Sequence, residues 1–201
     1  MVLFDKRHRL PVVAAVIALA ATWVPQPANA GSNCMPITAP VLEIAAVDCT
    51  QVWSQLQATG QFPDVFFGSG KKTSLCYAST GPVAATIGSA PVTIKSTVSG
   101  WTTDFTPFLL GGGDNLGTVV TALTIADVSG NSLAQLFTRD TIDLSQIFTT
   151  GTASEEDVIV GGTAYFTGAQ GTYRLGSVPE DQQASKVRLI NLSGELCLNG
   201  N

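Results

Sequence analysis

The sequence is short of charge and almost free of histidine. Only 12% of its 201 residues are charged, whereas about a quarter are charged in an average soluble domain. The single histidine is His8, and none follows it. The rest of the chain therefore has no Ser-His-Asp or Cys-His catalytic machinery and no histidine-ligated zinc or haem. We expect no metal or other cofactor.

The first thirty residues have the three parts of a secretory signal peptide. Three basic residues within Met1–Arg9 precede an apolar run, Leu10–Val24, and Ala28-Asn29-Ala30 is a small-residue cleavage site. The apolar run is 15 residues long, which is shorter than the ~20 residues of a membrane-spanning helix. We therefore expect cleavage after Ala30 and a secreted or periplasmic protein without a membrane span.

The expected mature chain is acidic. Cleavage leaves 171 residues with seven basic and fourteen acidic side chains, a net charge of −7. Scattered cations on an acidic chain argue against nucleic acid and against anionic membranes as partners. The length is sufficient for one domain with a real core.

All four cysteines lie in the expected mature chain, and an even number in an exported protein predicts two disulfides. Three pairings are possible. A four-thiolate metal site is the alternative, but the short C-x-x-C spacing typical of such sites is absent. Cys34, Cys49 and Cys76 lie near the start and Cys197 lies near the end. If all four pair, at least one bridge joins the two ends of the chain.

The sequence changes in texture near residue 80. Within residues 31–80, apolar side chains recur at helical spacing over Val41–Ala58, which predicts one short helix or two with a break near Asp48. We interpret residues 31–80 as an N-terminal helix and loop cap and residues 81–201 as a β-barrel domain. The expected strands, rich in Val, Thr and Ile or alternating in polarity, are Val92–Val98, Leu116–Ala126, Leu133–Asp143, Asp157–Val160, Thr163–Leu175 and Lys186–Leu192.

Both faces of Leu116–Ala126 are apolar, because Val120 and Ala122 alternate with Val119 and Leu123. A strand with one solvated face alternates between apolar and polar residues instead. Either both faces are packed, or one face lines an apolar lumen and the other meets a cap or a partner subunit.

Two stretches resemble the allene oxide cyclase and dirigent barrels. Asp157–Leu175 reads D-V-I-V-G-G-T-A-Y-F-T-G-A-Q-G-T-Y-R-L, and its Gly161-Gly162 pair predicts a two-residue hairpin turn. Asp104–Phe108 resembles the cyclases' G-D-L-V-P-F segment and precedes a glycine-rich loop. The resemblance implies an eight-stranded antiparallel barrel with an apolar cavity, often trimeric, so a homotrimer is possible.

The family's chemistry is not carried over by this resemblance. Ala164 occupies a glycine position of the hairpin motif, and Leu110 and Leu123 stand where the plant cyclases have a pocket Asn and a pocket Cys. The ligand-binding candidates are Asp104, Phe105, Pro107, Phe108, Leu110, Leu123, Tyr165 and Tyr173.

Other polar residues are given ordinary roles. Arg139, Asp140 and Arg174 are expected mostly in solvated or cross-strand pairs, with one of Arg139 and Asp140 pointing inward. The acidic run Glu155-Glu156-Asp157 is interpreted as a solvated loop, with a Ca²⁺ site as the alternative.

For the disulfides, we expect Cys34–Cys49 and Cys76–Cys197, because the second bridge would fasten the barrel entrance to its last strand.

Two functions are consistent with these features. The first is an exported barrel that binds a small apolar molecule in its lumen, as a carrier or as a cofactor-independent cyclase- or isomerase-like or dirigent-like protein. Such chemistry needs shape and a polar group rather than a catalytic triad. The alternative is a secreted structural or interaction protein with a filled barrel and no catalytic site.

Overall fold

The computed structural model describes residues 34–65, 75–103, 115–181 and 185–198. The expected signal peptide, residues 1–30, lies outside these ranges. The strands are β1 Cys34–Ala46, β2 Cys76–Ser79, β3 Val83–Ile87, β4 Ala90–Trp101, β5 Leu116–Ala126, β6 Ser132–Asp143, β7 Ala153–Gly162, β8 Gln170–Pro179 and β9 Lys186–Cys197. Helix α1 spans Cys49–Ala58, and a 3-10 turn, η1, spans Ala164–Phe166.

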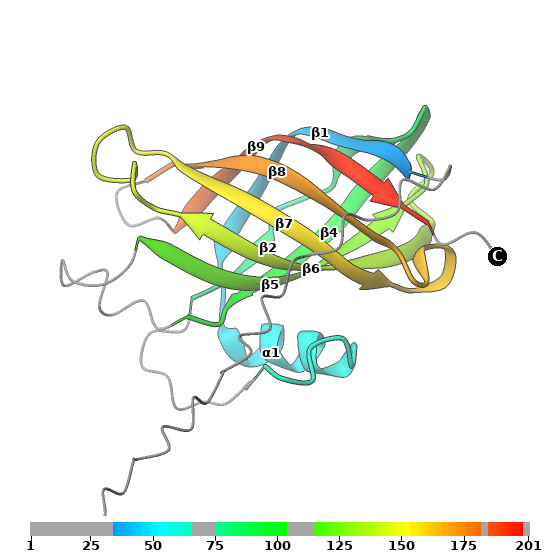
Figure 1. Ribbon diagram of the computed structural model, residues 1–201, viewed down its shortest axis with the longest axis horizontal. Coiled ribbons are helices and arrows are strands. Elements are labelled where there is room, and N and C mark those ends of the chain that lie inside the picture. The colour runs from blue at the N-terminus through cyan, green and yellow to red at the C-terminus, as the bar shows by residue number, and fades with distance from the viewer. Residues whose placement is uncertain (1–33, 66–74, 104–114, 182–184, 199–201) are drawn as a thin grey trace, which may run out of the picture.

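The strands form one closed antiparallel barrel (Figure 1). Each strand from β4 to β9 pairs with the next, and β1 closes the sheet by pairing with β9 from Cys34–Cys197 to Ala45–Lys186. The short strands β2 and β3 share one position between β1 and β4, at opposite ends of the barrel. The structure thus has eight strand positions and one extra strand, which confirms the expected fold class.

The two ends of the barrel differ in how they are filled. At the disulfide end, where Cys34 pairs with Cys197, large apolar side chains occupy the interior and are almost completely buried. They include Ile37, Ile94, Ile125, Leu136, Phe166 and Leu196. The opposite end, where β4 and β6 finish and β5 and β7 begin, contains the cavity described below and is here called the cavity end.

Helix α1 packs on the outside of the barrel (Figure 1). Asp48 caps its first turn by accepting a hydrogen bond from the Thr50 amide at 2.7 Å. Its buried side chains, Val52 and Leu56, pack with Phe62 and with the outer face of the barrel. The barrel contributes Val120, Ala122 and Phe137 to this second cluster. The two apolar faces of β5 are therefore explained by a lumen on one side and a cap on the other.

No helix within the described ranges is long and apolar enough to cross a membrane.

The segment expected to be a helix from Val41 onward is partly a strand. Residues 41–46 belong to β1, and α1 begins only at Cys49. Leu42 and Ile44 point inward, while Val41 and Glu43 are exposed, so the period is two. Pairing with β9 outweighed the weak helical spacing. Part of the segment interpreted as a cap is thus a barrel strand.

The hairpin between β7 and β8 is confirmed, but the expected two-residue turn is wrong. Gly161 and Gly162 end β7, and residues 163–169 form the connection, including η1. Gly162 is needed for close packing, because a Cβ there would lie 2.6 Å from the Gln135 carbonyl oxygen. The connection has two left-handed positions, Gly168 with φ of 72° and Ala164 with φ of 47°, and Ala164 is the one that carries a Cβ.

Both disulfides form, as expected, but their connectivity is Cys34–Cys197 and Cys49–Cys76. The expected pairing was wrong because Cys34 begins a barrel strand instead of lying in a cap. The first bridge joins the two strands that close the barrel, and the second joins α1 to β2. The expectation that one bridge links the ends of the chain is confirmed.

Replacing Ala164 by glycine should stabilise the protein. A left-handed backbone costs about 1–2 kcal/mol for a residue with a Cβ, and the greater freedom of glycine in the unfolded chain offsets part of this gain. We expect a gain of roughly 0.5–1 kcal/mol in the free energy of unfolding, measured by urea denaturation. Gly151→Ala is the reverse control, because Gly151 has φ of 71° and open space around it. It should lose stability, and a loss in Ala164→Gly would contradict this account.

A carboxyl cluster in the barrel lumen

A cavity of about 410 Å³ occupies the cavity end of the lumen. Its walls are mainly hydrocarbon and come from every position around the barrel, including Leu42, Trp101, Leu123, Ile142, Leu175 and Leu189. Gly117 makes room for one of these walls, because a Cβ there would lie 2.1 Å from the Trp101 ring. Pockets of roughly 300–1,000 Å³ with apolar walls are typical of small-molecule sites.

Three carboxyl groups gather inside this apolar lumen. Asp140 on β6 lies directly opposite Asp157 on β7, and Glu155 lies two residues before Asp157 on the same face. One carboxylate oxygen from each of the three lies within 4.8 Å of the others. The exposed fractions are 2% for Asp140 and Asp157 and 8% for Glu155. Glu155 and Asp157 line the cavity, and Asp140 is their buried neighbour.

Hydroxyl groups surround the cluster. The Thr121 hydroxyl on β5 donates to Asp140 Oδ2 at 2.5 Å and is hydrogen-bonded at 2.9 Å to Ser99 on β4. Tyr173 on β8 lies opposite Asp157. Four buried oxygens have no hydrogen-bond partner among the described residues, although buried polar atoms usually have one. They are Thr97 Oγ1, Thr138 Oγ1, Asp140 Oδ1 and Asp157 Oδ2.

Burial is the main reason why these carboxyl groups resist ionisation. It raises the pKa of Asp140 to about 6, against the opposing effect of the Thr121 hydrogen bond. Burial and the charge of Asp140 raise the pKa of Glu155 and of Asp157 well above their ordinary values. The closeness of the two carboxyls favours ionisation of Asp140 and raises the pKa of Asp157 further. Asp140 therefore ionises first, while Asp157 keeps its proton.

Other titratable groups reach the cavity from two more walls. Burial raises the pKa of Tyr173 well above its usual value, and nearby Asp157 adds to this effect. Burial likewise raises the pKa of Tyr77 on β2, with a further contribution from the charge of Asp181, which follows β8. Tyr77 and Asp181 also line the cavity. No lysine or arginine lines it in the part of the chain that the structure describes, so the cluster has no cationic side chain beside it.

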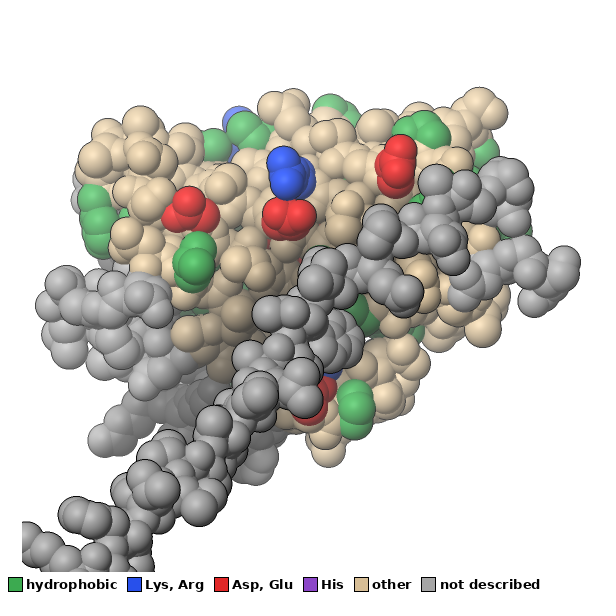
Figure 2. Space-filling view, viewed as in Figure 1, with side chains coloured by type: hydrophobic (Ala, Val, Ile, Leu, Met, Phe, Trp, Pro, Cys, Tyr) green, Lys and Arg blue, Asp and Glu red, His purple; other side chains and the backbone are tan. Residues whose placement is uncertain are grey.

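The basic residues near the cluster in sequence point outward. Arg139 forms an ion pair with Asp64, with 3.0 Å between Nη1 and Oδ2, and lies over the Phe62 ring at 5.7 Å. Arg174 pairs with Glu156 at 3.3 Å on the exterior. The expectation that one of Arg139 and Asp140 points inward is confirmed. Charged side chains are few and scattered on the face shown in Figure 2.

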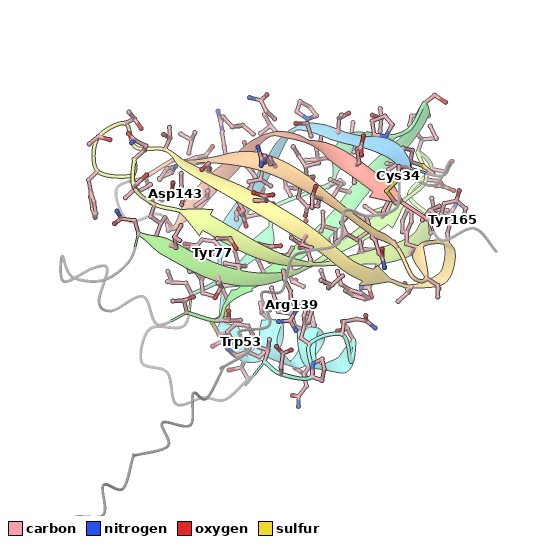
Figure 3. All side chains as sticks on the ribbon, in the orientation of Figure 1. Cys34, Trp53, Tyr77, Arg139, Asp143 and Tyr165 are labelled. Atoms are coloured by element: carbon pink, nitrogen blue, oxygen red, sulfur yellow. A yellow bond between two sulfur atoms is a disulfide. The ribbon has the colours of Figure 1, made fainter. Side chains whose placement is uncertain are left out.

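Two of the eight ligand-binding candidates line the cavity, namely Leu123 and Tyr173. Tyr165 does not, because it lies in η1 at the disulfide end with 66% of its surface exposed (Figure 3). Its expected place inside the barrel is wrong, since the turn between β7 and β8 breaks the alternation that links it to Tyr173. The other five candidates, Asp104, Phe105, Pro107, Phe108 and Leu110, lie outside the described residues.

Sequence reasoning missed Glu155 and Asp157. The acidic run is not a solvated loop but part of β7, in which Glu155 and Asp157 face inward and Glu156 faces outward. Alternation alone misleads here, because Val158 and Val160 are the more apolar residues and yet are 45% and 37% exposed. The signal that could have found them is Ile159. Residues 155, 157 and 159 share one face of the strand, so a buried Ile159 predicts that Glu155 and Asp157 also face inward.

Comparison with known proteins provides no template for this site. No family model matches the chain, and neither curated proteins nor solved structures yield a match. The chemistry of the lumen must therefore be inferred from its own residues.

The buried carboxyls should make the protein less stable as the pH rises. A carboxyl whose pKa is higher in the folded state binds its proton more tightly there, so stability is full below the unfolded pKa and is lost up to the folded pKa. For Asp140, between its ordinary 3.8 and about 6, this loss is about 3 kcal/mol. Asp140→Asn should flatten the fall in urea-denaturation free energy between pH 4 and pH 7.

Asp143→Asn is the matched control for this measurement. Asp143 ends the same strand at the barrel surface, where it is only partly buried, and hydrogen bonds from Ser145 lower its pKa. The variant should keep the wild-type slope between pH 4 and pH 7. A wild-type protein whose stability rises across this range would contradict burial of the cluster.

Proposed function

We propose that this protein binds a small, mainly apolar molecule in the lumen of its barrel. The observation that carries the proposal is a cavity of about 410 Å³ with apolar walls and a polar base made by Glu155, Asp157 and Tyr173. A few polar groups within an apolar pocket are the usual arrangement for orienting a ligand. The binding free energy would come mainly from burial of apolar surface.

The cavity favours this function over a structural protein with a filled barrel. The disulfide end shows that the chain can fill its interior with Ile, Leu and Phe side chains. At the cavity end the same strands leave space and bury acids, which costs stability unless a partner is bound. A purely structural barrel gains nothing from either feature.

Export, the family relationship and assembly are parts of the same proposal. The signal-like residues 1–30 and the two disulfides support secretion or a periplasmic location. The closed eight-stranded barrel is compatible with kinship to allene oxide cyclase and dirigent proteins. A homotrimer is implied by that resemblance alone.

Blocking the lumen should abolish binding of an apolar probe. Leu123 lines the cavity and is 1% exposed, so Leu123→Arg should eliminate the fluorescence increase of the neutral dye N-phenyl-1-naphthylamine. Leu123→Trp is a second, uncharged variant in case the arginine prevents folding, which circular dichroism would reveal. Leu123→Trp should weaken dye binding by about tenfold, because the larger side chain fills part of the cavity.

Val158→Arg is the control for this experiment. Val158 is 45% exposed on the outer face of β7, so the same charge outside the barrel should leave dye binding unchanged. Folded Leu123 variants that bind the dye as the wild type does would contradict the proposal.

A second candidate function is acid catalysis inside the lumen. Asp157 lines the cavity with its pKa raised well above the ordinary value, so it can carry a proton at neutral pH. A protonated carboxyl in an apolar site is a suitable general acid for an isomerisation. Such a barrel would need neither histidine nor a cofactor.

An apolar epoxide tests this second candidate. We expect the protein to accelerate the isomerisation of trans-stilbene oxide to diphenylacetaldehyde, and Asp157→Asn to lower the rate by about 10²-fold or more. Glu156→Gln, a change on the exterior of the same strand, should keep the rate. A wild-type protein that binds the epoxide and leaves it unchanged would exclude this function and leave the binding proposal intact.

A further inference from the structure

The lumen contains buried polar oxygens without hydrogen-bond partners and no basic side chain among the described residues. Asp157 Oδ2 and the hydroxyl of Thr97 have no partner among the described residues, and both residues line the cavity while being 2% exposed. Thr97 belongs to β4 and Asp157 to β7, three strand positions away around the barrel. Unpartnered oxygens thus face the cavity from two walls. No described lysine or arginine reaches them.

We propose that the molecule bound in the lumen carries a protonated amine, which Asp157 and Glu155 hold at the base of the cavity while its apolar body packs against the walls. This inference rests on the proposed function and specifies the class of its ligand. An ammonium group supplies two or three N–H donors together with a positive charge. Charge-assisted hydrogen bonds of this kind are shorter and about twice as strong as neutral ones.

The charge at the base of the cavity suits one cation of single charge. Asp140 ionises first and lies directly opposite Asp157, so one negative charge is buried in the cluster near neutral pH. A bound ammonium would favour ionisation of Asp157 and Glu155 as well, because opposite charges within ~4–6 Å lower a carboxyl pKa. The ligand would then offset part of the stability cost of burying these acids.

A divalent metal ion fits the same cluster less well. Ca²⁺ takes six to eight oxygen ligands, and Mg²⁺ demands an octahedral set. Here one oxygen from each of the three carboxyls lies within 4.8 Å of the others, and the walls of the cavity are mainly hydrocarbon. A bare ion would leave the apolar cavity beside the acids unfilled, whereas the apolar body of an amine would occupy it.

Ligands with one alkyl chain and different head groups test this inference. Isothermal titration calorimetry would compare decylamine, decan-1-ol and decanoate with the mature, disulfide-bonded protein. We expect decylamine to bind about tenfold or more tightly than decanol, and decanoate to bind most weakly. Between pH 5 and pH 7.5 the affinity for decylamine should rise as the carboxyls ionise, and that for decanol should stay constant.

The double variant Glu155→Gln/Asp157→Asn should lose the preference for the amine and keep its affinity for decanol. If the double variant does not fold, the single variant Asp157→Asn is used in its place. The matched control is Glu156→Gln, because Glu156 lies between the two acids on the outer face and pairs with Arg174. It should bind all three ligands as the wild type does.

The outcomes separate the inference from the proposed function. Equal affinity for decylamine and decanol, or an amine preference that survives in the double variant, would overturn the inference and leave lumen binding in place. Binding of Ca²⁺ or Mn²⁺ that displaces decylamine from the wild type alone would assign the carboxyls to a metal and overturn it too. If neither decylamine nor decanol binds, the proposed function itself fails.

Discussion

The removal of three carboxyl groups from water is the constraint on which the interpretation of this molecule depends. A barrel of this size could enclose hydrocarbon alone, yet Asp140, Glu155 and Asp157 face its interior. Burying acids without cations costs free energy, and here the cost is limited by proton uptake and by the Thr121 hydroxyl. The proposed role in binding or chemistry rests on this arrangement, which does not stabilise the free protein.

The rest of the fold makes this arrangement tolerable. The disulfide end supplies a dense apolar core, and the Cys34–Cys197 bridge joins the two strands that close the barrel. Outside, α1 covers β5, and the Cys49–Cys76 bridge anchors it. Trp53 of this helix lies so close to Gly100 that a Cβ there would be 1.9 Å from its ring. These contacts hold the barrel together while its lumen contains buried polar groups.

The sequence predicts the barrel better than it predicts the site. Strands with a clear local sequence pattern, such as Leu116–Ala126, were located correctly, because runs of β-branched residues and the turns that bound them are local signals. β1 was missed because its alternation is short and only pairing with β9 fixes it. Leu123 and Tyr173 were found as lining residues, whereas Asp157 was not. Its inward position depends on the register of β7 against β6, which composition does not reveal.

The most direct test of the account is an NMR titration of the side-chain carboxyl carbons of the protein. The account predicts that Asp140 titrates near pH 6. It also predicts that Glu155 and Asp157 retain their protons well above the usual range. Asp64 and Asp127 lie outside the lumen, hydrogen bonds lower the pKa of each, and both should titrate below it. Ordinary titration midpoints near pH 4 for all three lumen carboxyls would contradict the buried cluster, and with it the site.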